Sequence, residues 1–125
     1  MIEVTDDQFE HLINESMDEL PQEYIRNMKN VAVTFADEPS PEQLQKQKLH
    51  HGQTLLGLYE GIPLTKRGAG YSLVLPDKIT LFKGPLSRYS FDHAGFKKQI
   101  KHTLWHEIAH HFGLDHDRIR ELENK

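Results

Sequence analysis

Cysteine is absent from this chain of 125 residues. Its absence excludes disulfide bonds, zinc ribbons with cysteine ligands, iron–sulfur clusters and thiol nucleophiles. A metal ion bound here would need nitrogen and carboxylate ligands. Long apolar runs are also lacking, because no stretch approaches the roughly 18 residues of a membrane span, and the N-terminal segment is acidic where a signal peptide would be basic. We therefore expect a cytoplasmic protein with no membrane partner.

The composition, with 37% apolar and 27% charged residues, is that of a folded globular protein, and the length predicts one domain over residues 1–125. Charge is unevenly distributed. Residues 1–45 hold eleven acidic and two basic side chains, a net charge of −9, whereas residues 46–105 hold ten basic and three acidic ones, +7. The basic residues are scattered without a tight run, which favours a solvated surface. We expect a monomer that binds no nucleic acid.

Helical periodicity marks two long segments. The first opens on a capping-box pattern, Thr5 to Gln8, and runs to about Leu20, where a proline interrupts it. The second spans residues 93–112, with apolar residues at the spacing of a buried helix face, and Gly113 supplies its C-terminal stop. Shorter helices are expected over residues 22–28 and 117–123.

Strand-forming runs fall between the two long helices, over residues 31–36, 55–59, 71–75 and 79–82. The last two flank Pro76–Lys78, which is typical of a hairpin turn. Residues 42–51 are expected to form a surface loop or one frayed helical turn. The order predicts an α+β fold in which a small mixed or antiparallel sheet of three to four strands packs against two long helices, with the active-site helix near the C-terminus.

The second long helix ends in HEIAHHFGLDH, which fits the pattern HExxHxxGxxH from His106 to His116. His106 and His110 lie four residues apart and project from one helix face, so both can reach a single Zn²⁺ ion. Glu107 lies on the flank of that face, where its carboxylate can hold the metal-bound water. Gly113 permits the chain to reverse and brings His116 back as the third ligand.

The neighbouring residues have less specific roles. His102 lies one turn before His106, but three histidines at successive turns span about 12 Å along the axis, too far to meet one ion. We expect His111, which points about 100° away from His110, to be exposed or packed. Asp115 could be an alternative third ligand, or it could accept a hydrogen bond from the N–H of a ligand imidazole.

The ligand set predicts hydrolysis. Three protein ligands leave a fourth position for water, whose proton Glu107 can take as the water attacks a carbonyl and then pass to the leaving amine. Tyr71 and Arg67, near a glycine-rich turn, are candidates to stabilise the oxyanion or contact substrate. Residues 71–75 could form an edge strand that receives an extended peptide. The expected partner is a peptide or an unfolded protein segment.

The motif resembles that of the zincin metallopeptidases. Residues 2–122 are similar to the small bacterial zincin-like metallopeptidases sometimes called minimal zincins, through segments such as VAVTFADEPSP, LLGLYEGIPLTKRGAGY and LPDKITLFKGPL. The resemblance implies a zincin-like fold, with the sheet over the active-site helix and Zn²⁺ at His106, His110 and position 116. Members of the family often carry Asp at that last position, and His116 makes the set more like that of metzincins, whose Met-turn this chain lacks.

Two alternatives remain open at this point. The spacing HxxxHxxGxDH also resembles a bacterial metal-dependent endoribonuclease family of ribosomal RNA maturation, which places three histidines on one zinc. Glu107, which that family does not require, and the upstream segments favour the metallopeptidase. The other alternative is a non-catalytic module that keeps zinc for stability.

Overall fold

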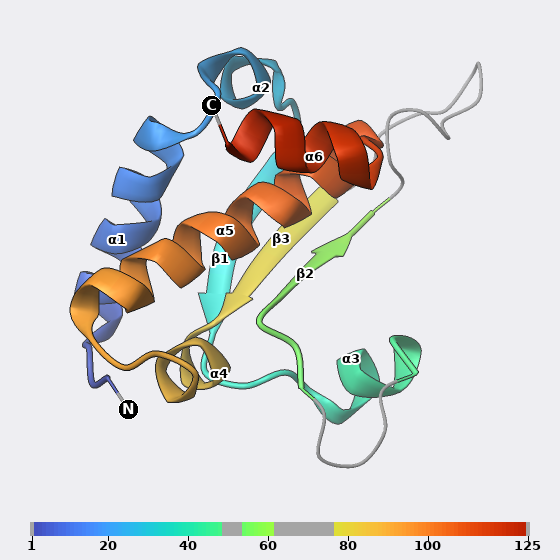
Figure 1. Ribbon diagram of the computed structural model, residues 1–125. Coiled ribbons are helices and arrows are strands. Elements are labelled where there is room, and N and C mark those ends of the chain that lie inside the picture. The colour runs from blue at the N-terminus through green and yellow to red at the C-terminus, as the bar shows by residue number, and fades with distance from the viewer. Residues whose placement is uncertain (1, 49–53, 62–76, 125) are drawn as a thin grey trace.

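A computed structural model describes residues 2–48, 54–61 and 77–124. Figure 1 shows the elements in chain order from blue to red. The helices are α1 (Asp6–Glu19), α2 (Gln22–Asn27), α3 (Pro41–Lys46), α4 (Lys83–Arg88), α5 (His93–Phe112) and α6 (His116–Glu123), and the strands are β1 (Val31–Ala36), β2 (Gly57–Glu60) and β3 (Asp77–Phe82).

The three described strands form one mixed sheet in the order β1-β3-β2. The central strand β3 pairs in parallel with β1, where Val33 lies opposite Ile79, and antiparallel with β2, where Tyr59 lies opposite the same Ile79. Four consecutive residues of β3, from Ile79 to Phe82, are buried, as expected for a strand with neighbours on both edges. The α+β class, with a mixed sheet and a long helix near the C-terminus, is confirmed.

The long helix α5 lies across the sheet, with α1 beside it and α6 over its C-terminal half (Figure 1). Its buried apolar residues Phe96, Ile100, Leu104 and Ile108 pack into one cluster with Ile79 and Leu81 of β3. Both ends of α5 coincide with the predicted bounds of residues 93 and 112. None of the helices in the described ranges is long and apolar enough to cross a membrane.

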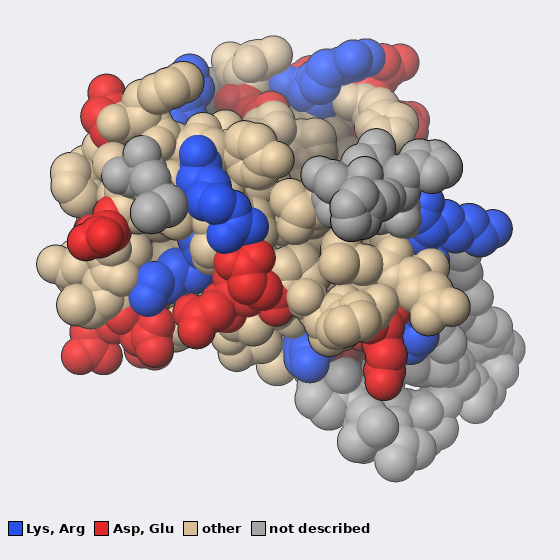
Figure 2. Space-filling model, turned by 90° about the horizontal axis from the view of Figure 1, so that it is seen from below, with Lys and Arg blue, Asp and Glu red and all other residues tan. Residues whose placement is uncertain are grey.

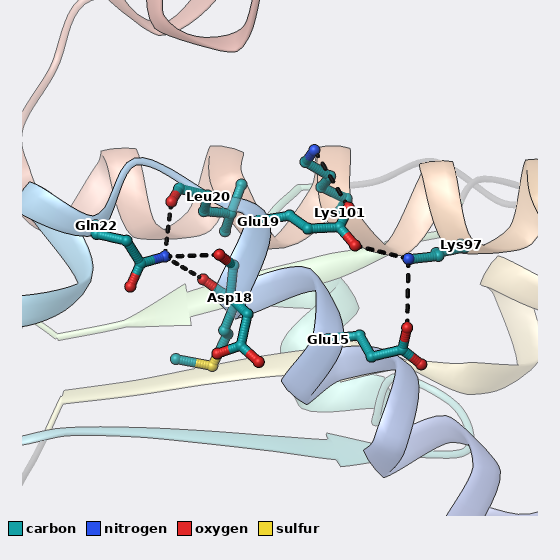
Figure 3. A network of polar contacts seen from close by, with 8 residues as sticks. Glu15, Asp18, Glu19, Leu20, Gln22, Lys97 and Lys101 are labelled. Atoms are coloured by element: carbon teal, nitrogen blue, oxygen red, sulfur yellow. Dashed lines mark hydrogen bonds and ion pairs between the residues drawn. The ribbon is translucent and has the colours of Figure 1, made fainter.

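Polar contacts orient α1 against α5, and Figure 3 shows them from close by. The Lys97 ammonium donates to Glu19 at 2.7 Å and to Glu15 at 3.4 Å, and Lys101 lies 3.5 Å from Glu19. The hydrogen bond from Lys97 lowers the pKa of the Glu19 carboxyl below its ordinary value. At the end of α1, the Gln22 side chain donates to three backbone carbonyls at 2.8–3.0 Å. The last carbonyl groups of a helix have no partner within the helix, and Gln22 supplies one here.

In the segment before α5, one prediction was wrong and one helix was missed. Strand β3 begins at Asp77, where a hairpin turn was expected, because Asp77 and Lys78 pair with the first residues of β1. Helix α4 was not predicted, since it contains Gly84 and Pro85, both poor helix formers. Its formation depends on packing that buries Leu86. The predicted strand over residues 71–75 lies outside the described residues.

The segment after β1 is held to α4 by an ion pair. The two terminal guanidinium nitrogens of Arg88 donate to the Glu38 carboxylate, at 2.7 and 2.9 Å, which lowers the pKa of Glu38 and raises that of Arg88. Because the Glu38 pKa is lower in the folded than in the unfolded chain, the pair stabilises the fold above the unfolded pKa and ceases to do so as pH falls through the folded pKa.

We expect Glu38→Gln to reduce the free energy of unfolding at pH 7 by about 0.2–1 kcal/mol, since both side chains are about half exposed and screened by solvent. The difference from wild type should shrink as the pH falls below the lowered pKa of Glu38, because the carboxyl is then protonated in the wild type too. Urea unfolding of the two proteins at several pH values measures the stability difference at pH 7 and its decrease at lower pH. An equal difference at pH 7 and at pH 2 would contradict this account.

Candidate metal centre and active site

The motif occupies the last two turns of α5 and the turn into α6. Gly113 ends α5 in the left-handed conformation, with φ at 70°, and its backbone N–H donates to the last turn of the helix. The Asp115 side chain then accepts from the Arg118 N–H at 2.8 Å and caps α6, which begins at His116. The chain therefore reverses at Gly113, as the glycine at this position predicted.

Helix α6 returns along α5 in the opposite direction. The Trp105 indole N–H donates to the Ile119 carbonyl at 3.1 Å, and further along, Nδ1 of His102 lies 2.6 Å from Oε2 of Glu123. Trp105 and Ile119 are both buried, which fixes α6 by apolar contact as well as by the hydrogen bond.

Glu107 is positioned by close approach of α5 to β2. A Cβ atom added at Gly57 would lie 2.6 Å from Thr103 Cγ2 and 3.4 Å from Glu107 Cγ, so a side chain at this position would push the helix from the strand. The Glu107 side chain is only 12% exposed. The Glu107 side chain is therefore largely shielded from solvent and lies close to the backbone of β2 at Gly57.

His106 presents a ring nitrogen suited to a metal ion. Its Nε2 is buried and has no hydrogen-bond partner among the described residues, whereas a buried polar atom without a partner ordinarily costs about 1–3 kcal/mol. Burial lowers the pKa of His106, and the neighbouring His102 lowers it further. The imidazole is therefore neutral at pH 7, which is the form that binds metal.

His110 is oriented by Glu107. Its Nδ1 lies 3.1 Å from Glu107 Oε1, and this hydrogen bond raises the pKa of His110. The carboxylate can only accept, so Nδ1 carries the proton and, in the neutral imidazole, Nε2 keeps the lone pair. Half of the His110 side chain is exposed, which leaves that nitrogen accessible.

The structure does not gather the three predicted ligands around one point. Among the described residues, the group whose ligand atoms all lie within 4.8 Å of one another is His102, His106 and Glu123. His110 and His116 are outside this group, and His116 is exposed at the start of α6. The assignment of zinc to His106, His110 and His116 remains a prediction, as does a role for Asp115 as a ligand or as an acceptor for a ligand imidazole.

The residues nevertheless fit a metal ion. The Nε2 of His106, which is buried and has no partner among the described residues, is a donor that suits a zinc site, and His110, four residues on, has a half-exposed imidazole. The predicted oxyanion residues, Arg67 and Tyr71, lie outside the described residues, so their role also remains a prediction.

A buried polar cluster behind Glu107 was not foreseen. Asp77 Oδ2 accepts from the Tyr59 hydroxyl at 2.6 Å and lies 3.1 Å from His111 Nδ1, and the His111 ring is fully buried. The cluster ties the end of α5 to the start of β3. The helical spacing contained a signal for it, because His111 falls three and seven residues after the buried Ile108 and Leu104.

With this geometry described, the chain can be placed among known proteins. The chain belongs to the zincin-like metallopeptidase family, whose model matches residues 28–125. Membership implies a metal-binding protein.

One similar solved structure is a conserved hypothetical protein from Thermus thermophilus, with a TM-score of 0.57 and 23% identity over 86% of this chain and 92% of that one. At this identity the likeness establishes the fold alone. No curated protein matches the chain.

Proposed function

We propose that this protein is a zinc-dependent metallopeptidase in which His106, His110 and His116 hold the ion and Glu107 is the general base. The observation that carries the proposal is the buried Nε2 of His106, which has no partner within the described part of the chain and lies one residue before Glu107, whose side chain is only 12% exposed. Bound zinc would polarise a substrate carbonyl and acidify a water molecule.

Each residue of the site has a defined task. Glu107 takes the proton from the attacking water at a carboxylate oxygen and delivers it to the nitrogen of the departing amine. His110 fixes the orientation of the Glu107 carboxylate through the hydrogen bond between Nδ1 and Oε1. Gly57 allows β2 to approach Glu107, and a peptide extended along this side of the sheet would bring a carbonyl carbon toward the carboxylate.

The substrate class follows from the distribution of charge and from the strand beside Glu107. On the face seen from below in Figure 2, the Lys and Arg side chains of the described residues lie among Asp and Glu side chains and form no continuous basic stripe of the kind that tracks a phosphate backbone. The strand beside Glu107 supplies main-chain hydrogen-bonding groups, which suit an extended peptide. We therefore propose peptides or unfolded protein segments as substrates.

The test is cleavage of a mixed peptide library, followed by mass spectrometry of the products. We expect the wild type to cleave, a metal chelator to reduce the rate by about 100-fold or more, since removing the metal removes both the polarised carbonyl and the acidified water, and added Zn²⁺ to restore it. Parallel incubation with structured RNA should give no cleavage. RNA cleavage without peptide cleavage would overturn the proposal in favour of an endoribonuclease.

A further inference from the structure

His106 belongs to two possible ligand sets. It lies four residues before His110 and four residues after His102, so the same relation that pairs it with one neighbour pairs it with the other. Helix α6 runs back along α5, with His116 at its start and Glu123 at its end, where Glu123 meets His102. The pair His102 and His106 thus has a third donor, Glu123, nearby on α6.

We propose that His102, His106 and Glu123 form a second metal-binding position, distinct from the motif and competing with it for His106. Their ligand atoms already lie within 4.8 Å of one another. Two imidazoles and one carboxylate are a donor set that zinc accepts.

The required movements are small. A tetrahedral Zn²⁺ ion with bonds of about 2.0–2.1 Å separates its ligand atoms by about 3.3 Å. Nδ1 of His102 and Oε2 of Glu123, now 2.6 Å apart, would therefore move apart by less than about 1 Å, and the other distances, at most 4.8 Å, would close by at most about 1.5 Å. The ring centroids of His102 and His106 are 4.3 Å apart, so both imidazoles already face the same space.

An ion can reach this position from solvent. His102 and Glu123 line a cavity of about 550 Å³, whose walls also include Leu20, Trp105 and Leu122. The His102 side chain is 52% exposed and that of Glu123 is 28% exposed, so both can exchange their mutual hydrogen bond for bonds to a metal.

The sharing of His106 has a measurable consequence. Because we place the same His106 nitrogen in both sets, only one set can hold an ion at a time, and the ratio between the two positions is independent of the free zinc concentration. Loss of one set should leave the other. Zinc binding after loss of the motif set would distinguish a metal-binding position from an ion pair between His102 and Glu123 that binds no metal.

The experiment measures zinc affinity by competition with a chromophoric chelator, using the full chain and Zn²⁺ alone. The variant His110→Gln/His116→Gln lacks the motif set and should still bind one zinc ion per chain. Adding Glu123→Gln to that background should weaken binding by about 100-fold or more, because loss even of a residue that only supports a ligand commonly costs about 10–100-fold. Adding His102→Gln should have the same effect, whereas the matched control Glu121→Gln on the same helix should change nothing.

Two outcomes would overturn the second position: no zinc binding by His110→Gln/His116→Gln, or an unchanged affinity when Glu123→Gln is added. Circular dichroism of each variant without metal checks that it is folded, and the replaced side chains are all at least partly exposed. The result is independent of the proposed peptidase activity, since that activity depends on Glu107, His110 and His116 in a chain with His102 and Glu123 intact.

Discussion

Glu107→Gln should lower the rate of peptide cleavage by about 10²–10⁴-fold while zinc stays bound, the loss that follows when a general base is removed. Glutamine matches glutamate in shape, and its Oε1 can still accept the hydrogen bond that Glu107 now receives from His110 Nδ1 at 3.1 Å. The ligand imidazole therefore keeps its orientation. Only the capacity to take and return a proton is lost.

The measurement compares initial cleavage rates and zinc content of wild type, Glu107→Gln and Glu121→Gln. Glu121, exposed on α6, is the matched control and should behave as wild type in both assays. Equal cleavage by wild type and Glu107→Gln would contradict the assigned role. Zinc binding by both proteins with cleavage by neither would instead favour a non-catalytic zinc module.

Asp77→Ala should reduce the free energy of unfolding by about 2–6 kcal/mol, because the Tyr59 hydroxyl and the His111 ring each lose a hydrogen-bond partner in a buried cluster, at about 1–3 kcal/mol apiece. Asp77 is 3% exposed and His111 is fully buried. The substitution deprives the Tyr59 hydroxyl of an acceptor at 2.6 Å and the His111 ring of one at 3.1 Å. It also releases the tie between the end of α5 and the start of β3.

Chemical denaturation of wild type and Asp77→Ala measures this loss, with the exposed Asp117→Ala as the control, for which a change within about 0.5 kcal/mol is expected. The double variant Asp77→Ala/His111→Ala should cost less than the two single changes together, because both remove the same interaction. A loss below about 1 kcal/mol for Asp77→Ala would show that the cluster contributes little to stability, since that is the range of an exposed ion pair.

The sequence predicted those parts of the fold whose signals are local. The apolar spacing in α5, a capping residue before it and Gly113 after it define both helix ends without help from the rest of the chain. The start of β3 could not be predicted in this way. Pro76–Lys78 has the composition of a turn, yet Asp77 is extended because it pairs with Val31, 46 residues earlier in the chain, and contacts His111.

The same distinction applies to the candidate site. The motif placed His106, Glu107 and His110 on one stretch of helix from spacing alone. The contact between His102 and Glu123 joins residues 21 positions apart and exists because Ile119 and Trp105 dock α6 onto α5. No pattern within α5 specifies that docking, so the sequence offered no reason to place Glu123 beside His102.

The most direct test of the metal centre is the zinc content of the protein, purified without chelators and measured by elemental analysis. The account predicts one zinc ion per chain in the wild type and none in His106→Gln, since His106 contributes to both ligand sets. A folded wild type without stoichiometric zinc, or a His106→Gln variant that retains it, would contradict the account.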